Sequence, residues 1–192
     1  MLLAAALARG FWYKVWFRLR GRRFSAGRNF RVFGRIVLRG PGEVRIGDDA
    51  VIYGKTTPWT HSAEAQIRIG NRAIMDGVRF GCVKAITLGD GCRLAPCEIL
   101  DTDFHSTRAD RNTNRAAPVR VAPVVIEDNV WVAAQAALLP GTFIGRNSVV
   151  GYGAICIQRY PENSILFGNP ARKVAPVLSG ARSAPPTSDQ SP

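Results

Sequence analysis

The sequence predicts an all-β fold in which short strands wind into a parallel β-helix of six-residue repeats. The first observation is an apolar side chain at every sixth position: Ile126, Val132, Leu138, Ile144, Val150 and Cys156. The second is a small or β-branched residue four places after each of the first five: Val130, Ala136, Thr142, Ser148 and Ala154. Neither an α-helix nor an alternating strand has this period. Three such units, each a strand and a corner, close one coil of about eighteen residues, and the coils stack in parallel.

The same rhythm extends toward the N-terminus with two interruptions. Leu88, Leu94 and Leu100 are six residues apart, as are Ile46 and Ile52. The phase slips by two positions between Leu100 and Ile126. We therefore expect residues 105–122, which are polar and basic, to project from the coil as a loop. A second break is expected over residues 53–66. The predicted β-helix spans 31–174, and the Pro-, Ser- and Ala-rich stretch 175–192 is predicted to be a disordered tail.

Residues 1–30 form a separate basic segment that is predicted to contain a short helix. Such a helix gathers apolar side chains on one broad side: Leu3, Leu7, Trp12, Val15, Trp16 and Leu19. Basic residues interrupt it too often for a membrane-spanning helix, and the charge order is not that of a signal peptide. Two interpretations stay open. The helix packs on the fold or on a neighbouring subunit, or residues 1–23 lie on a membrane surface; both can hold together.

The net charge favours polyanionic partners. Lys and Arg number 26 against 14 Asp and Glu, which gives a formal charge of +12. The chain has no signature of a nucleic-acid-binding module, so nucleic acid is not expected as a partner. The four cysteines form no CxxC pair, which favours reduced, structural thiols and a cytoplasmic location, with the inner face of the membrane as the alternative if the helix binds lipid.

Four motifs resemble one known family. They are DTDFHS at 101–106, DNVW at 128–131, PG at 140–141 and GNPAR at 168–172. Residues 123–173 resemble the C-terminal half of bacterial hexapeptide-repeat acetyltransferases, which include maltose, galactoside, nodulation-type and polysaccharide O-acetyltransferases. The resemblance implies a left-handed coil, acetyl-CoA as co-substrate, and a homotrimer with sites between subunits. It implies acetyl transfer to a sugar hydroxyl.

His105 is the candidate general base, because the resemblance places the family's catalytic histidine here and imidazole titrates near ~6.5. The expected mechanism is direct attack by the acceptor in a ternary complex. On an extended strand Asp101 and Asp103 share a face with His105, so each carboxylate is a candidate to orient the ring or to contact the sugar. A plain structural role in a turn is the open alternative for each. His61 lacks a motif and is only a minor candidate for acceptor contact. Two histidines cannot form a three-histidine zinc site, so no metal is expected.

The resemblance also assigns the remaining candidate residues. The backbone N–H of Ala134 is the expected oxyanion donor. Related enzymes often orient the histidine with an asparagine from a preceding coil; the nearest position here is Met75 or Asp76, so Asp76 is a minor candidate for that partner and for acceptor contact. The expected acetyl-CoA contacts are Trp131, Ala134, Tyr152, Gln158, Arg159, Arg172 and Lys173. Gln158 stands where the family commonly has lysine, and Tyr152 where it commonly has a small residue.

Three functions compete at this point. The leading one is O-acetyl transfer to a sugar or a surface-polysaccharide precursor. The second is N-acetyl transfer, or transfer of a longer acyl chain, to an amino sugar. The third is a non-catalytic basic β-helix that serves as a scaffold. The presence of His105 and of GNPAR favours an enzyme over a scaffold.

Overall fold

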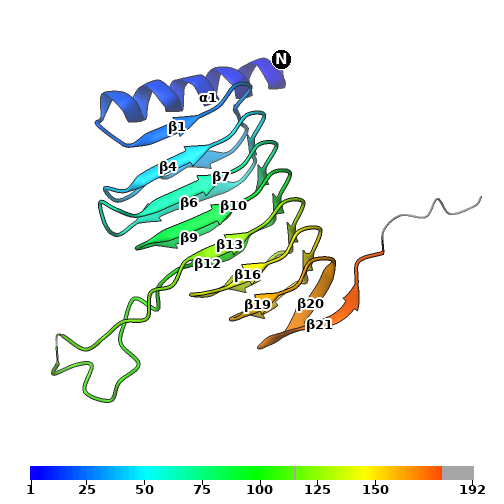
Figure 1. The fold of residues 1–192 in the computed structure, drawn as a ribbon. Helices are drawn as coiled ribbons and strands as arrows, with labels where there is room; N and C mark the ends of the chain where they lie inside the picture. The colour runs from blue at the N-terminus through cyan, green and yellow to red at the C-terminus, as the bar shows by residue number, and fades with distance from the viewer. Residues whose placement is uncertain (115, 179–192) are drawn as a thin grey trace, which may run out of the picture.

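The computed structural model describes residues 1–114 and 116–178, and it has one helix followed by three sheets that wind as a β-helix (Figure 1). Helix α1 spans Leu2–Leu19. Sheet A contains β1 (Phe24–Ala26), β4 (Glu43–Ile46), β7 (Gln66–Ile69), β10 (Ala85–Leu88), β13 (Val124–Ile126), β16 (Phe143–Ile144) and β19 (Arg159–Tyr160). The predicted class, mostly β with one N-terminal helix, is confirmed.

The other two sheets complete each triangular coil. Sheet B contains β2 (Arg31–Val32), β5 (Val51–Ile52), β8 (Ile74–Met75), β11 (Arg93–Leu94), β14 (Trp131–Val132), β17 (Val149–Val150), β20 (Ser164–Gly168) and β21 (Ala171–Pro176). Sheet C contains β3 (Arg35–Ile36), β6 (Lys55–Thr60), β9 (Arg79–Cys82), β12 (Glu98–Leu100), β15 (Ala137–Leu138) and β18 (Ile155–Cys156). Neighbouring strands are parallel except β20 and β21.

The six-residue repeat fills the interior as predicted. All six apolar positions from Ile126 to Cys156 are at most 1% exposed, and so are the five small or β-branched positions between them. In the preceding coil, however, the core position belongs to Ile99 and not to Leu100. Ile99 pairs with Leu138, while Leu100 is half-buried beside Gly81. The reason is a corner one residue shorter between Leu94 and Ile99 than between Val132 and Leu138.

The expected break at 53–66 is wrong for residues 55–60, which form strand β6, and for Gln66, which begins β7. Pro58 lies six residues after Ile52 and pairs with Phe80 in the core register. Polar Thr56 and Thr60 are 1% exposed, so the repeat continues here with polar residues at some of its buried positions. The hydroxyl of Thr60 accepts a hydrogen bond from the Gly42 N–H and donates one to the Arg39 carbonyl, which makes its burial acceptable.

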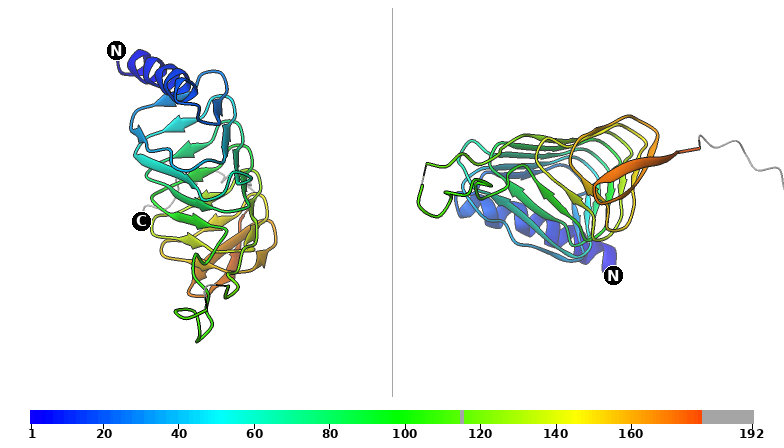
Figure 2. Two further views of the ribbon diagram at one scale, coloured as in Figure 1. Left: turned by 90° about the vertical axis from the view of Figure 1, so that its left-hand side faces the viewer. Right: turned by 90° about the horizontal axis from the view of Figure 1, so that it is seen from below.

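The segment between β12 and β13 projects from the coil, as predicted (Figures 1 and 2). Its two ends are held together: the Asp103 N–H donates to the Arg120 carbonyl at 3.1 Å, and the Ala122 N–H donates to the Asp101 carbonyl at 2.9 Å. Beyond it the chain re-enters sheet A in register, with Leu88 beside Ile126. The phase slip in the sequence is therefore absorbed by the loop.

Both ends of the coil are covered. Helix α1 lies over the N-terminal end and buries Ala6, Gly10 and Phe17. Strand β21 pairs antiparallel with β20 at the other end, so residues 175 and 176 of the expected tail belong to a strand. The rest of that tail, from residue 179, lies outside the described residues. The β-helix itself begins at Phe24, seven residues before the expected boundary at 31.

Among the described residues, no helix combines the length and the apolarity that a membrane crossing requires.

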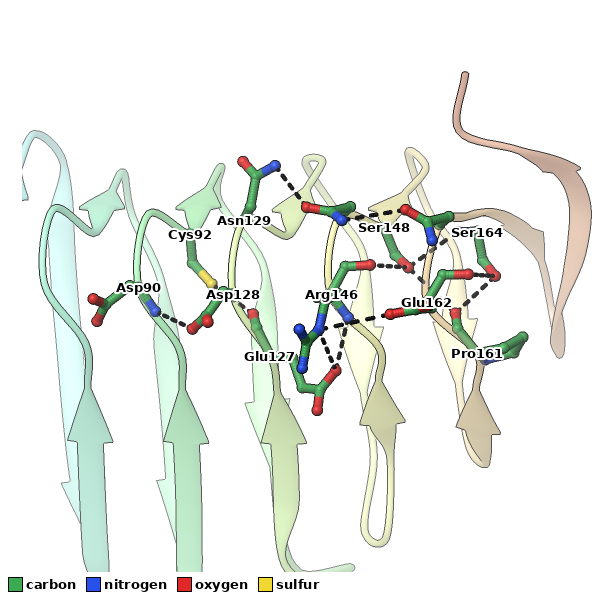
Figure 3. A network of polar contacts seen from close by, with 12 residues as sticks. Asp90, Cys92, Glu127, Asp128, Asn129, Arg146, Ser148, Pro161, Glu162 and Ser164 are labelled. Carbon is green, nitrogen blue, oxygen red and sulfur yellow. Dashed lines mark hydrogen bonds and ion pairs between the residues drawn. The ribbon is translucent and has the colours of Figure 1, made fainter. Parts of the chain in front are cut away.

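The corner between sheets A and B repeats one geometry along the whole coil. One residue in each coil has a positive φ there: Asn29, Asp49, Arg72, Gly91, Asn129, Asn147 and Asn163. Neighbouring corners are joined by side chains, as where the Asp90 N–H donates to Asp128 at 2.7 Å and the Asn129 amide donates to Asn147 at 3.0 Å (Figure 3). Asparagine tolerates this left-handed conformation better than most residues. This edge is structural.

Candidate active site

His105 sits in a tight turn at the base of the projecting loop. Its N–H donates to the Asp103 carbonyl at 2.7 Å, and Phe104 between them has a φ of 59°. The Phe104 N–H donates to the Thr102 hydroxyl at 3.0 Å. Because the chain turns here, residues 101, 103 and 105 do not share the face of a strand, contrary to expectation. The His105 side chain is exposed, as a base that must meet a substrate has to be.

Asp101 holds the neighbouring corner. Its side chain is fully buried, and its two oxygens accept hydrogen bonds of 2.7 Å from the N–H groups of Val83, Lys84 and Ala85. The Cys82 thiol lies 3.4 Å from the same carboxylate. This carboxylate is thus committed to the corner below the loop. The half-buried Asp103 carboxylate makes no hydrogen bond within the described chain, so it is the freer of the two candidate partners of His105.

An aromatic row, which we define as Trp59, His61 and Phe104, supports the turn that carries His105. The Trp59 and His61 rings stack with centroids 4.5 Å apart, and the Phe104 ring meets His61 edge-on at 4.7 Å. Phe104 lies over Gly81, where an added Cβ would come within 2.6 Å of its ring. Loss of water around the His61 imidazole lowers its pKa, although the nearby Asp101 charge opposes this shift. Sequence reasoning gave His61 little weight; its i, i+2 spacing from Trp59 is the signal that places both on one face.

Three other candidates gather at the corner between sheets B and C. Ala134 lies in the turn between β14 and β15, and its N–H donates no backbone hydrogen bond within residues 1–114 and 116–178. Tyr152 occupies the matching turn one coil later and is 60% exposed. Asp76 follows β8, two coils before the Ala134 turn, and is also exposed. A free amide at Ala134 can serve a developing oxyanion.

The expected acetyl-CoA contacts divide between two faces. Trp131 is 52% exposed on β14 of sheet B. Arg172 and Lys173 are exposed on β21, which β17 and β20 connect to β14 in that sheet. Gln158 and Arg159 instead lie at the corner between sheets C and A, where the Arg159 guanidinium packs 3.9 Å over the Phe143 ring.

The candidate base and the candidate oxyanion donor are therefore not neighbours within one chain. In a parallel sheet all strands begin at one edge, and sheet C has Ala134 at that edge and His105 at the opposite one. Five residues of extended chain separate the two edges by about 16 Å. A site that uses both groups has to combine the His105 edge of one chain with the Ala134 edge of another.

The described residues contain no group of three or more His, Cys, Asp or Glu side chains that could hold a metal ion. The four cysteines are free and buried, and burial raises the pKa of Cys92 to about 11 and those of Cys97 and Cys156 to about 12. Such thiols are poor nucleophiles near neutral pH.

Comparison with solved structures identifies the class of fold. The chain resembles a maltose O-acetyltransferase from Clostridium difficile, with a TM-score of 0.54 and 24% identity over 93% of this chain and 89% of the other. It also resembles the polySia-specific acetyltransferase NeuO, with a TM-score of 0.56 and 20% identity over 84% and 90% of the two chains. The protein therefore has the left-handed β-helix fold of hexapeptide-repeat acetyltransferases.

Sequence comparison adds particular relatives. The chain is 35% identical to the galactoside O-acetyltransferase of Lactococcus lactis over 85 residues, which are 44% of this chain and 40% of that protein. It is 32% identical to the galactoside O-acetyltransferase of Escherichia coli over 89 residues, 46% and 43% of the two chains. The matches thus span less than half the length of these relatives. No protein-family profile matches the chain.

Proposed function

We propose that the protein transfers an acetyl group from acetyl-CoA to a hydroxyl of a sugar or of a surface-polysaccharide precursor. The observation that carries the proposal is an exposed histidine, His105, fixed by a tight turn at the base of the projecting loop. The similarity to galactoside O-acetyltransferases over 44–46% of the chain supports the same reaction.

In the proposed reaction His105 removes the proton of the acceptor hydroxyl, and the oxygen attacks the thioester carbonyl. A C–O bond forms, and the N–H of Ala134 donates to the oxyanion of the tetrahedral intermediate. The C–S bond then breaks, and the proton passes from His105 to the thiolate of CoA. Asp103 is the proposed orienting partner of His105, because Asp101 is committed to the corner at 83–85.

The proposed carrier site follows sheet B. Trp131 and Tyr152 flank the pantetheine arm near the reacting thioester, and the basic residues of β21, Arg172 and Lys173, bind phosphates. Strand β21 is three strands from β14, which is about 14 Å across a sheet and suits an extended arm. Gln158 and Arg159 lie at a different corner, so they contribute to a carrier site only across a subunit boundary.

We propose that the protein is a homotrimer with sites between subunits, because His105 and Ala134 occupy opposite edges of sheet C. Complementation tests this arrangement. His105→Ala and Ala134→Pro chains, each inactive alone, should regain about a quarter of the wild-type activity when mixed at random, since one interface in four then carries both intact groups. Two variants that stay inactive after mixing would refute the shared site.

The reaction is tested by CoA thiol release from acetyl-CoA in the presence of mono- and disaccharides. His105→Ala should lower acceptor-dependent release by about 10²-fold or more while acetyl-CoA binding is retained. Asp103→Asn should cause a smaller loss. A scaffold without activity would neither bind acetyl-CoA nor respond to the His105 change.

A second reaction is favoured by one residue. The exposed Tyr152 stands next to the proposed thioester site and changes the space available to the acyl chain. An amino sugar and butyryl-CoA belong in the same assay. If Tyr152→Ala alters the ratio of butyryl to acetyl transfer, this residue sets the chain length. Unchanged selectivity would remove it from that role.

We propose that residues 1–23 contact the inner face of the membrane. Phe11, Trp12 and Leu19 on α1 are 50–79% exposed, and Arg18 and Arg20 are exposed beside them. Exposed aromatic and basic side chains on one helix suit an anionic lipid surface. Phe11→Ser with Trp12→Ser should abolish co-sedimentation with phosphatidylglycerol vesicles, whereas Tyr53→Ser, which removes an exposed aromatic ring from the β-helix, should not. Equal binding by all proteins would refute the contact.

A further inference from the structure

A groove crosses the outer face of sheet C, from the chain that follows β3 to the start of β15. Its volume is about 820 Å³, and its lining includes Val37, Arg39, Lys55, Thr57, Trp59 and Arg79. These residues come from β6, β9 and the chain that follows β3, so a rigid sheet forms the floor. The residues that line this groove are distinct from those assigned to acetyl-CoA above. At its far end the lining includes Gln135, which follows Ala134 in the chain.

The groove is positively charged. Three basic side chains, Arg39, Lys55 and Arg79, line it together with one carboxylate, Glu98, which leaves a net charge of +2. Arg79 is paired with that carboxylate at 2.9 Å. Arg39 and Lys55 form no ion pair with any residue in the described parts of the chain. Two cations in a concave site attract an anionic ligand more strongly than the same cations on a flat surface.

One of these cations is held in place. The Arg39 guanidinium lies 5.2 Å from the centroid of the Trp59 ring, and Arg39 pairs with Trp59 across a parallel bridge. The cation–π contact fixes the guanidinium while leaving its donors available to a carboxylate or a phosphate. An arginine fixed in this way loses less conformational freedom on binding.

The charged groove leads to the candidate base. Trp59 lines the groove and stacks on His61, which meets Phe104, the residue before His105. The aromatic row therefore connects the anion-binding cations to the turn that presents the imidazole. A saccharide that lies along the row brings its acidic group to Arg39 and Lys55 and a hydroxyl toward the loop.

We infer that the acceptor is an acidic saccharide, whose carboxylate or phosphate binds Arg39 and Lys55. This inference rests on the proposed acetyl transfer and adds the chemical class of the acceptor. It also makes Arg39 and Lys55 the residues that distinguish an acidic acceptor from its neutral counterpart, because a neutral sugar gives them no ion pair.

The test uses matched acceptors and matched variants of the full chain. Trigalacturonic acid is compared with its methyl ester, and N-acetylglucosamine 1-phosphate with N-acetylglucosamine, so that the arms separate a carboxylate from a phosphate. The double variant Arg39→Gln with Lys55→Gln should raise KM for the acidic member of the accepted pair at least tenfold. The KM for acetyl-CoA and the KM for neutral sugars should stay unchanged. Lys55→Gln alone leaves the contact of Arg39 with Trp59 intact and should give a smaller rise.

Arg68→Gln is the control, because Arg68 is exposed on β7 in sheet A, away from the groove. Binding of each acceptor is also measured by saturation-transfer NMR, which does not require turnover. Acidic acceptors that bind through Arg39 and Lys55 without being acetylated would support the groove and contradict acetyl transfer. Acetylation of neutral and acidic acceptors with equal KM, or failure of every acidic probe to bind, would overturn the inference and leave acetyl transfer to be judged by thiol release.

Discussion

Asp101 gives the sharpest test of how the loop is anchored. The change Asp101→Ala removes a buried carboxylate that accepts three hydrogen bonds of 2.7 Å from the N–H groups of Val83, Lys84 and Ala85. Each buried N–H left without a partner costs about 1–3 kcal/mol. The corner is only partly buried, so water replaces some of these bonds, and we expect a total loss of about 3–5 kcal/mol in the free energy of unfolding.

Urea unfolding followed by far-UV circular dichroism measures this loss. For a slope of about 2 kcal/mol per M, the midpoint should fall by about 2 M. All proteins are compared at one protomer concentration, because subunit association adds to apparent stability. Asp103→Ala is the matched control, since the Asp103 carboxylate makes no hydrogen bond within the described chain, and we expect a change of about 0.5 kcal/mol or less.

The two aspartates should differ in the property that each one affects, catalysis for Asp103 and stability for Asp101. Asp103→Asn should lower kcat while leaving the urea midpoint unchanged, because its proposed partner is the His105 ring. The main effect of Asp101→Ala should be a lower urea midpoint. If Asp101→Ala unfolds at the same urea concentration as Asp103→Ala, the carboxylate does not hold the corner and our reading of the site is wrong.

Three further outcomes follow from the described contacts. Gly81→Ala should lower kcat about tenfold, because its Cβ would come within 2.6 Å of the Phe104 ring and displace the turn; an unchanged kcat would show that the aromatic row does not position the base. Hydrogen bonds from Asn71 lower the pKa of Asp90 in the folded state, so its stabilisation is present above the unfolded pKa and is lost as the pH falls through the folded pKa. The urea midpoint should therefore decrease when the pH is lowered below about 4, and this decrease should be less steep in Asp90→Asn. The same pH dependence in both proteins would contradict this. Burial raises the pKa of Cys92 to about 11, so its thiol should resist Ellman's reagent at pH 8 until urea unfolds the chain, and rapid reaction in the native protein would refute its burial.

The fold was predictable because its core positions recur at a fixed spacing. From Ile126 to Cys156 the residue at every sixth position is apolar and buried, so the period is visible without a structure. The rhythm was misread where the chemistry of the core changes. Strand β6 was taken for a break because two of its buried residues, Thr56 and Thr60, are polar. A shortened corner moved the core position from Leu100 to Ile99.

The candidate site was predictable only in part. The motif around His105 identified the loop, but sequence spacing treated residues 101–105 as a straight strand. In the structure the chain turns at Phe104, which has a positive φ, and the Asp101 carboxylate accepts hydrogen bonds from three N–H groups instead of facing His105. His61 and Arg39 lie far from His105 in the sequence, and only the stacking of coils brings them to one face. Contacts between coils have no local sequence signature, so the groove could not be predicted.

The two ends of the projecting loop are hydrogen-bonded to each other at its base, so the loop sequence can change independently of the coil. Residues 101–103 and 120–122 are joined to each other, and the chain re-enters sheet A in register with Ile126 beside Leu88, so the solenoid does not depend on the residues between 103 and 120. A short glycine-rich bridge in place of residues 104–119 should leave a folded but inactive coil. The part of the loop beyond His105 can therefore diverge in sequence, and contacts to new acceptors can arise there without altering a single core residue.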